Sequence, residues 1–267
     1  MQKHIPQGKD VFIRPDIAWP TLALAGCTLT VWGFALVSNL PYGLSFILTC
    51  ITAYICFTPM HDATHSSTSR HGWFNQLLGT MVGIPLMAPF TAFRVIHLQH
   101  HKHTNEALYD PDRWSGTGPT WLLPVKWLTQ DLHYYWFYFI FLKRPLKERL
   151  SVCAELLLIG AFTFGLAQII GWQAILYYFI LPARLASAAL AFAFDYLPHV
   201  PHQTPAKVDR FAATRIMLNP IFNYLFLNQN YHLVHHLYPA VPFYRYPVAW
   251  MHKEKQLRAQ GAKVEYF

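Results

Sequence analysis

Charged residues are scarce in this chain of 267 residues. Asp, Glu, Lys and Arg make up 13% of it, whereas a soluble domain carries about 25%. More than half of the residues are apolar and 16% are aromatic, as is typical of proteins whose rings gather at a membrane interface. This composition favours a membrane protein over a soluble one.

Cysteine is also rare, and no cysteine motif is present. The four cysteines lie in apolar runs without CxxC spacing, at Cys27, Cys50, Cys56 and Cys153. We therefore expect buried, reduced thiols rather than disulfide bonds or a zinc site. The chain also lacks any Glu-x-x-His pair, the motif with which soluble di-iron helix bundles hold their metal.

Long apolar runs define the expected architecture. A helix needs about 20 mostly apolar residues to cross the hydrocarbon core of a bilayer. We expect four spans, at residues 17–38, 44–60, 150–170 and 172–197, which turns around Pro41 and Gly171 join into two hairpins. The expected fold class is an all-α, integral membrane protein with one domain over residues 1–267.

The net charge of +8 is distributed as in a multi-pass membrane protein. The hairpin turns at residues 39–43 and 171–173 contain no Lys or Arg, while the N-terminus, the middle segment and the tail hold nearly all of them. The positive-inside rule therefore places residues 61–149 and 198–267 on the cytoplasmic side, as a helical cap. We expect no nucleic-acid partner. Arg184 falls inside a span and is expected to pair with a polar group of the protein.

Histidine is abundant, with fifteen residues, and most of them are clustered. An HxxxH motif follows the second span, two HxxHH motifs lie in the middle segment and the tail, and one isolated histidine follows the fourth span. These residues are His61, His65, His97, His100, His101, His232, His235, His236 and His199. Helix positions i, i+3 and i+4 share one face, so each cluster presents its imidazoles in one direction at the same membrane boundary.

This number of imidazoles predicts a metal site. Imidazole is a ligand for iron, copper, zinc and nickel, and one structural ion takes about four ligands. Nine histidines therefore fit two ions with four or five ligands each. His202 could be a ligand, a partner of a ligand or part of a loop. A metal- or haem-binding membrane protein without oxygenase activity is a remote alternative, because haem ligands or transport ligands belong inside the spans.

The three histidine motifs, in this order and spacing, resemble those of the membrane fatty acid desaturase and hydroxylase superfamily. The resemblance covers about residues 17–246. Within the superfamily, Phe-Asp-Tyr-Leu-Pro-His at residues 194–199 and Tyr-His-Leu-Val-His-His-Leu-Tyr-Pro at residues 231–239 look most like bacterial β-carotene hydroxylase-type proteins. The resemblance implies two non-haem iron ions held by the nine histidines named above.

Three further residues are expected to orient or assist these ligands. Asp195 stands where acyl-CoA desaturases have an Asn that holds a water beside one iron. Asn228, four residues before His232, is expected to be a hydrogen-bond partner of a ligand. Asp62, inside the first motif, is expected either to orient a neighbouring histidine or to cap the helix.

The implied activity is an O2-dependent oxidation of a lipid. The first expectation is hydroxylation of a C–H bond on the ring of a carotenoid such as β-carotene. The alternative is a fatty acyl desaturase or acyl hydroxylase with the same di-iron site. No fused electron-carrier domain is recognisable, so a separate donor of the ferredoxin, rubredoxin or cytochrome type is implied. The expected location is a bacterial inner membrane, with the active site on the cytoplasmic side.

Overall fold

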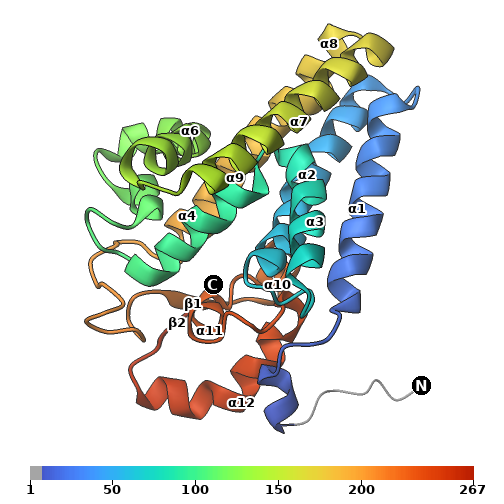
Figure 1. Cartoon of the computed structure of the whole chain (residues 1–267). Coiled ribbons are helices and arrows are strands. Elements are labelled where there is room, and N and C mark those ends of the chain that lie inside the picture. Colours follow the sequence, from blue (N-terminus) through green and yellow to red (C-terminus); the bar gives the residue numbers. More distant parts are fainter. Residues whose placement is uncertain (1–7) are drawn as a thin grey trace, which may run out of the picture.

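The computed structural model describes residues 8–267, which are predominantly helical (Figure 1). Four helical segments are long and apolar enough to cross a bilayer: α1 (Trp19–Val37), α2 (Tyr42–Thr64), α7 (Leu146–Ile170) and the fourth span Trp172–Tyr196. The fourth span is built from α8 (Trp172–Ile175), η6 (Leu176–Ile180), α9 (Leu181–Leu190) and η7 (Ala191–Tyr196). The expected all-α fold with four membrane helices is confirmed.

Helix α2 continues past the expected end of its span at Met60. It ends at Thr64, so His61 and Asp62 lie on its last turn. Both side chains are almost fully buried against neighbouring elements, which allows polar residues to continue a helix that hydropathy alone would end. The first histidine motif is therefore fixed rigidly to a membrane helix.

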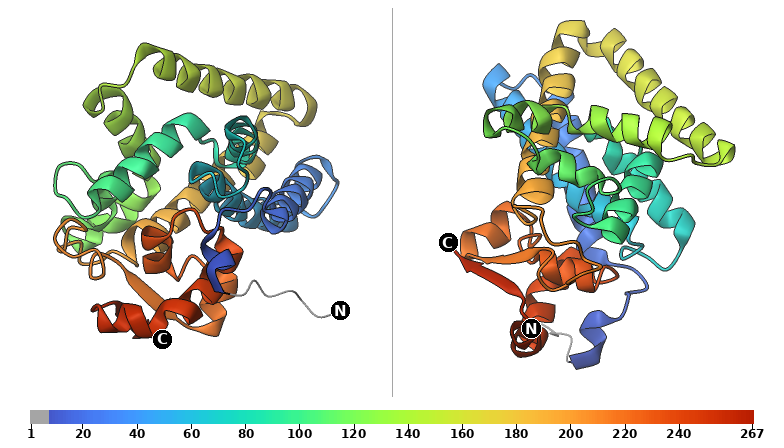
Figure 2. Two further views of the ribbon diagram at one scale, coloured as in Figure 1. Left: turned by 60° about the horizontal axis from the view of Figure 1, so that its bottom comes forward. Right: turned by 90° about the vertical axis from the view of Figure 1, so that its left-hand side faces the viewer.

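A sharply bent pair of helices follows α2. Helix α3 (Gly72–Gly83) and the short η2 (Ile84–Leu86) lead into α4 (Phe90–His103), and the axis turns by 98° between them. Pro85 and Pro89 cannot continue a regular helix, and Met87 adopts a left-handed conformation with φ of 53°. The bend directs the second histidine motif, on α4, toward the end of α2 (Figure 2).

The middle segment consists of short helices beside the ends of the spans. These are η3 (Pro111–Gly116), η4 (Thr120–Leu122), α5 (Leu123–Leu128), α6 (Gln130–Trp136) and η5 (Phe137–Phe141). Arg184 of α9 forms an ion pair with Asp131 of α6. This contact supplies the polar partner expected for Arg184 and ties the segment to the fourth span.

The tail forms a small layer at the bottom of Figure 1. It contains β1 (Arg215–Leu218), α10 (Pro220–Leu225), α11 (His232–Leu237), η8 (Phe243–Arg245), α12 (Tyr246–Ala259) and β2 (Lys263–Tyr266), with β1 and β2 pairing in parallel. Its own apolar core includes Ile216, Leu233, Tyr246 and Trp250, and Val11 of η1 (Gly8–Phe12) joins it. This core holds α11, which carries the third histidine motif, in place.

The cysteines differ in part from expectation. All four are free, but only Cys56 is buried, while Cys27 and Cys153 are exposed on α1 and α7. The outer surface of these helices also exposes large apolar residues such as Phe34 and Leu157. A surface of this kind is what acyl chains of a bilayer cover, so the thiols face lipid rather than the protein core.

Glu155 connects α7 to the bent helix pair. Its carboxylate accepts hydrogen bonds from the Thr91 backbone N–H (2.9 Å), the Thr91 hydroxyl (2.7 Å) and the Gln76 amide (2.8 Å). Thr91 lies in the first turn of α4, whose backbone N–H groups have no partner within the helix and where a negative charge is favourable. The contact thus holds the start of the helix that carries the second histidine motif.

Replacing Glu155 with Ala should destabilise the protein by about 1–3 kcal/mol, because three partly buried donors lose their acceptor. Glu155→Gln should retain part of the stability, since the amide oxygen can still accept. Thermal unfolding of the purified protein, followed by circular dichroism, measures both. The matched control is Glu254→Ala, which removes a surface ion pair with Arg258 and should cost less than about 1 kcal/mol. An equal effect of the two Ala substitutions would refute this role of Glu155.

Candidate metal centre

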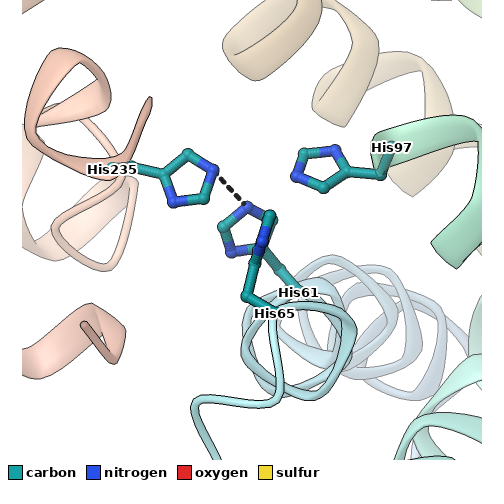
Figure 3. Close-up of side chains that lie close together, drawn as sticks. All are labelled: His61, His65, His97 and His235. Atoms are coloured by element: carbon teal, nitrogen blue, oxygen red, sulfur yellow. Dashed lines mark hydrogen bonds between the residues drawn. The ribbon is translucent and has the colours of Figure 1, made fainter. Parts of the chain in front are cut away.

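Nine histidines converge where α2, α4, α11 and the segment after the fourth span meet. They form two groups of four: His61, His65, His97 and His235, and His100, His199, His232 and His236. In each group the candidate ligand nitrogens all lie within 4.8 Å of one another. Figure 3 shows the first group, with His61 on α2, His65 directly after the end of α2, His97 on α4 and His235 on the side opposite His97.

The ninth histidine lies between the two groups. The Nε2 atom of His101 is 2.7 Å from that of His235 and 3.2 Å from that of His97. Its ring also stacks on His236, with the ring centroids 4.2 Å apart. The structure therefore brings together all nine residues of the three motifs and the isolated position after the fourth span.

The ring nitrogens of different elements face one another across a small space. The distance between Nε2 atoms is 3.1 Å for His61 and His235, and 2.9 Å for His199 and His232. Burial lowers the pKa of His199, His232, His235 and His236 well below the usual value, and neighbouring imidazoles lower it further. Neutral imidazole is the form that binds metals, so these rings have the protonation state of ligands.

Several outer nitrogens are held by other side chains. Nδ1 of His100 lies 2.8 Å from Oδ1 of Asp110, and Nδ1 of His235 lies 2.9 Å from the Tyr246 hydroxyl. Gln229 places its amide 3.3 Å from Nδ1 of His61. Such contacts fix the orientation of a ligand ring and leave Nε2 free for a metal.

Among residues 8–267, none of the three expected helper residues, Asp62, Asp195 and Asn228, forms a hydrogen bond with a histidine ring. The carboxylate of Asp62 accepts from the Thr21 hydroxyl (2.7 Å) and the Phe243 N–H (3.1 Å), and within the described chain no histidine ring is among its partners. It joins α1, α2 and the tail instead. Asp195 contacts Tyr134, at 3.0 Å from its hydroxyl. Asn228 has a left-handed backbone with φ of 63°, and the next residue, Gln229, is the one that reaches a histidine.

Sequence patterns did not identify Asp110, Gln229 and Tyr246. Their contacts with histidines span up to 168 positions in sequence, so no helical spacing indicates them. Asp110 precedes Pro111 and Asp112 in the middle segment, and this acidic pair near the second motif was the available signal. Tyr246 lies at the end of the region that the resemblance covers, residues 17–246, and nothing in the sequence around it indicated its role.

His202 lies outside both groups of four. Its ring stacks on His199 with the centroids 5.9 Å apart and packs against Gly116, where a Cβ atom would come within 2.2 Å of the ring. Burial lowers the pKa of His202 to about 4. Its observed role is thus to pack behind one candidate ligand.

Two adjoining cavities lie between the cluster and the helices of the second and fourth spans. The outer cavity, of about 70 Å³, is mainly apolar and includes Phe57, Met60 and Leu190. The inner one, of about 10 Å³, reaches His61, His97, His100 and His232. Four residues line both cavities: Phe57, Phe93, Tyr134 and Asp195. An apolar molecule in the outer cavity would therefore approach the histidines directly.

A hydrogen-bonded acidic group forms part of the wall of these cavities. The Tyr134 hydroxyl lies 2.6 Å from Oδ1 of Asp112 and 3.0 Å from Oδ2 of Asp195. A phenol has one proton, so it donates to one carboxylate at a time and the other contact needs a protonated carboxyl group. Burial raises the pKa of Asp112, which favours a protonated carboxyl group there.

Comparison with known proteins identifies a family and several relatives. The family model described as fatty acid desaturase matches residues 37–267. A fatty acid desaturase from Bacillus subtilis is 24% identical over 95% of this chain and 82% of its own length. An sn-1 oleoyl-lipid 12-desaturase from Anabaena variabilis is 26% identical over 83% of this chain and 71% of its own length. A chloroplastic omega-6 fatty acid desaturase from Brassica napus is 24% identical over 88% of this chain and 60% of its own length. Because the family model covers most of its length, the chain belongs to the fatty acid desaturase family.

Proposed function

We propose that this chain desaturates an acyl chain of a membrane lipid, using O2 and two iron ions held by the nine clustered histidines. The convergence of those histidines beside a mainly apolar cavity is the observation that carries the proposal. Membership of the family makes the chain an oxidoreductase and an integral membrane protein. The relatives named above supply the choice of substrate class, because they are fatty acid or lipid desaturases.

The acyl chain thereby replaces the carotenoid ring as the first candidate substrate. The histidine motifs cannot separate the two, since removal of a hydrogen atom from a C–H bond is common to hydroxylation and desaturation. The phrases around His199 and His232 suggested a carotenoid hydroxylase, but the named relatives support acyl-lipid chemistry.

The donor set fits iron. Imidazole is a suitable ligand for iron, and burial favours the neutral form of rings such as those of His232 and His235. Within each group of four, the candidate ligand nitrogens lie within 4.8 Å of one another. Bound iron would supply the activation of O2 that oxidation of an unactivated C–H bond requires. The protein residues hold the metal, with Asp110 and Tyr246 orienting His100 and His235 through their outer nitrogens.

The cavities determine how a lipid would approach. Phe57, Phe93 and Leu190 provide an apolar wall that excludes water from the route to the histidines. Tyr134 and Asp195 form the polar part of that wall. An acyl chain would enter from the bilayer, with its oxidised carbon beside the rings of His61 and His97.

The absence of Lys and Arg from residues 39–43 and 171–173 supports a cytoplasmic location of the histidines, and we propose the inner membrane of a bacterium. We also propose that the electrons come from a carrier protein of the ferredoxin, rubredoxin or cytochrome type.

Loss of the Tyr246 hydroxyl should weaken iron binding. Tyr246→Phe removes the hydrogen bond that orients His235 but leaves the ring in the core of the tail, so iron affinity should fall about 10-fold or more. Competition with a chelator measures the dissociation constant, and Tyr224→Phe, at an 82% exposed position, is the control. An affinity equal to that of the control would mean that the hydroxyl does not support the ligand.

The substrate class is tested by product analysis in cells. Cells that express the chain, with and without a supply of β-carotene, should accumulate newly unsaturated acyl chains, and His235→Ala should abolish them. Fatty acid methyl esters and pigments are analysed side by side. Hydroxylated carotenoid with unchanged acyl chains would overturn the choice of substrate. Unchanged acyl chains and unchanged pigments in aerated cells would overturn the proposal that the chain oxidises a lipid.

A further inference from the structure

A second opening reaches the histidines from the side away from the apolar cavities. It is a pocket of about 290 Å³, hereafter the basic pocket, lined by Lys102, Lys207, Arg210, His101 and His236 among others. These residues come from the end of α4, from the segment after the fourth span and from α11. The basic pocket shares no lining residue with the two cavities on the membrane side. The cluster is therefore accessible by two separate routes of opposite polarity.

The basic pocket carries an excess of positive charge. Lys207 pairs with Glu106, with 3.0 Å between Nζ and Oε2, so one of the three cations is compensated. Lys102 and Arg210 are exposed, and neither forms an ion pair with any of residues 8–267. No Asp or Glu lines the pocket in this described part of the chain. An approaching acidic surface would thus meet uncompensated cations at the rim.

The floor of the basic pocket consists of candidate metal ligands. His101 and His236 are partly exposed, whereas His61, His100 and His235 are at most 1% exposed. The rings of His101 and His236 stack with centroids 4.2 Å apart, and Nε2 of His101 lies 2.7 Å from that of His235. A molecule that docks over the pocket would touch the two rings that connect the aqueous surface to both groups of histidines.

We propose that the basic pocket is the docking site of an acidic electron-carrier protein, which passes electrons to the metal centre through His101 and His236. The inference rests on the proposed function, which requires electrons from a carrier in the aqueous phase. Each docking event would transfer one electron: the carrier would lose it, a ferric ion held by the histidines would gain it, and no covalent bond would change. Lys102 and Arg210 steer the acidic carrier and set its orientation.

An anionic lipid headgroup is the other ligand that three cations could attract. A lipid held there would have to pass its acyl chain between His101 and His236, although an apolar route to the histidines already exists on the membrane side. The polar lining and the separation of the two routes favour the carrier.

The test uses the purified, iron-loaded chain in nanodiscs of zwitterionic phosphatidylcholine. Stopped-flow absorbance follows electron transfer from reduced plant-type ferredoxin, and from reduced flavodoxin, at low and high salt. Arg210→Glu, eleven residues from the nearest clustered histidine, His199, is compared with the double variant Lys102→Glu, Arg210→Glu. The matched control is Lys255→Glu with Lys263→Glu, two exposed cations outside the pocket. Reduction by dithionite serves as a reference that needs no docking.

We expect Arg210→Glu to slow transfer from the carriers, and the double variant to slow it by about 10-fold or more at low salt. The difference should shrink as salt screens the charges, while the control pair and all dithionite rates remain within about twofold of the unsubstituted chain.

Unchanged transfer from both carriers in the double variant would overturn the proposal. An equal loss with dithionite would also overturn it, because the substitutions would then act on the metal centre. Retained transfer together with weaker binding to phosphatidylglycerol vesicles would assign the pocket to a lipid headgroup instead. The proposed function is tested independently: a chain that accepts electrons from ferredoxin yet yields no unsaturated acyl chain keeps the docking site and loses the desaturase activity.

Discussion

Nine imidazole rings whose nitrogens face one another would repel strongly if all of them were protonated, and burial opposes that. The exception is His100, whose pKa the carboxylates of Asp112 and Asp110 raise to about 9 against the effect of burial. Desolvation of the charged form and the nearby imidazoles both lower the pKa of His232 and His235. The same burial requires that the rings arrive on rigid elements, since a solvated loop would not exclude water. Helix α2 therefore continues past its apolar run, the bend after α3 redirects α4, and the tail has its own core to hold α11. Each of these features places histidine rings in the same small volume.

The environment of the cluster is asymmetric, and this asymmetry follows from its place at a membrane boundary. Toward the spans, Phe57, Phe93 and Leu190 surround the approach with apolar surface. Toward the aqueous side, Lys102 and Arg210 stand above the partly exposed rings of His101 and His236. A lipid and a water-soluble carrier could thus reach the same metal centre without competing for one entrance. The ion pair between Arg184 and Asp131 joins the fourth span to the helices that form the wall between bilayer and cluster.

Local patterns sufficed for the parts of the structure that local geometry determines. The length of the apolar runs predicted the four membrane helices, and the i, i+3, i+4 spacing predicted which histidines share a face. The partners of those histidines lie on other elements. Gln229 is 168 positions from His61, while Tyr246 and Asp110 are 11 and 10 positions from His235 and His100, and none of these separations is the i+3 or i+4 spacing of a helix. Asp62 illustrates the same limit: its place inside a histidine motif suggested either a ligand partner or a helix cap, whereas its carboxylate joins α1 to the tail. The sequence motifs did not identify the substrate either, because their residues are candidate ligands of the metal and do not determine which lipid binds.

The iron content of the purified chain tests the account most directly. The protein is loaded anaerobically with ferrous iron, desalted, and assayed by inductively coupled plasma mass spectrometry beside His235→Ala and the exposed His252→Ala. His235 belongs to one group of four and also contacts His101 between the groups. The account predicts two iron ions per chain for the unsubstituted protein and for His252→Ala, and a clear loss for His235→Ala. An unsubstituted chain that retains no iron, or a His235→Ala chain that retains both ions, would contradict it.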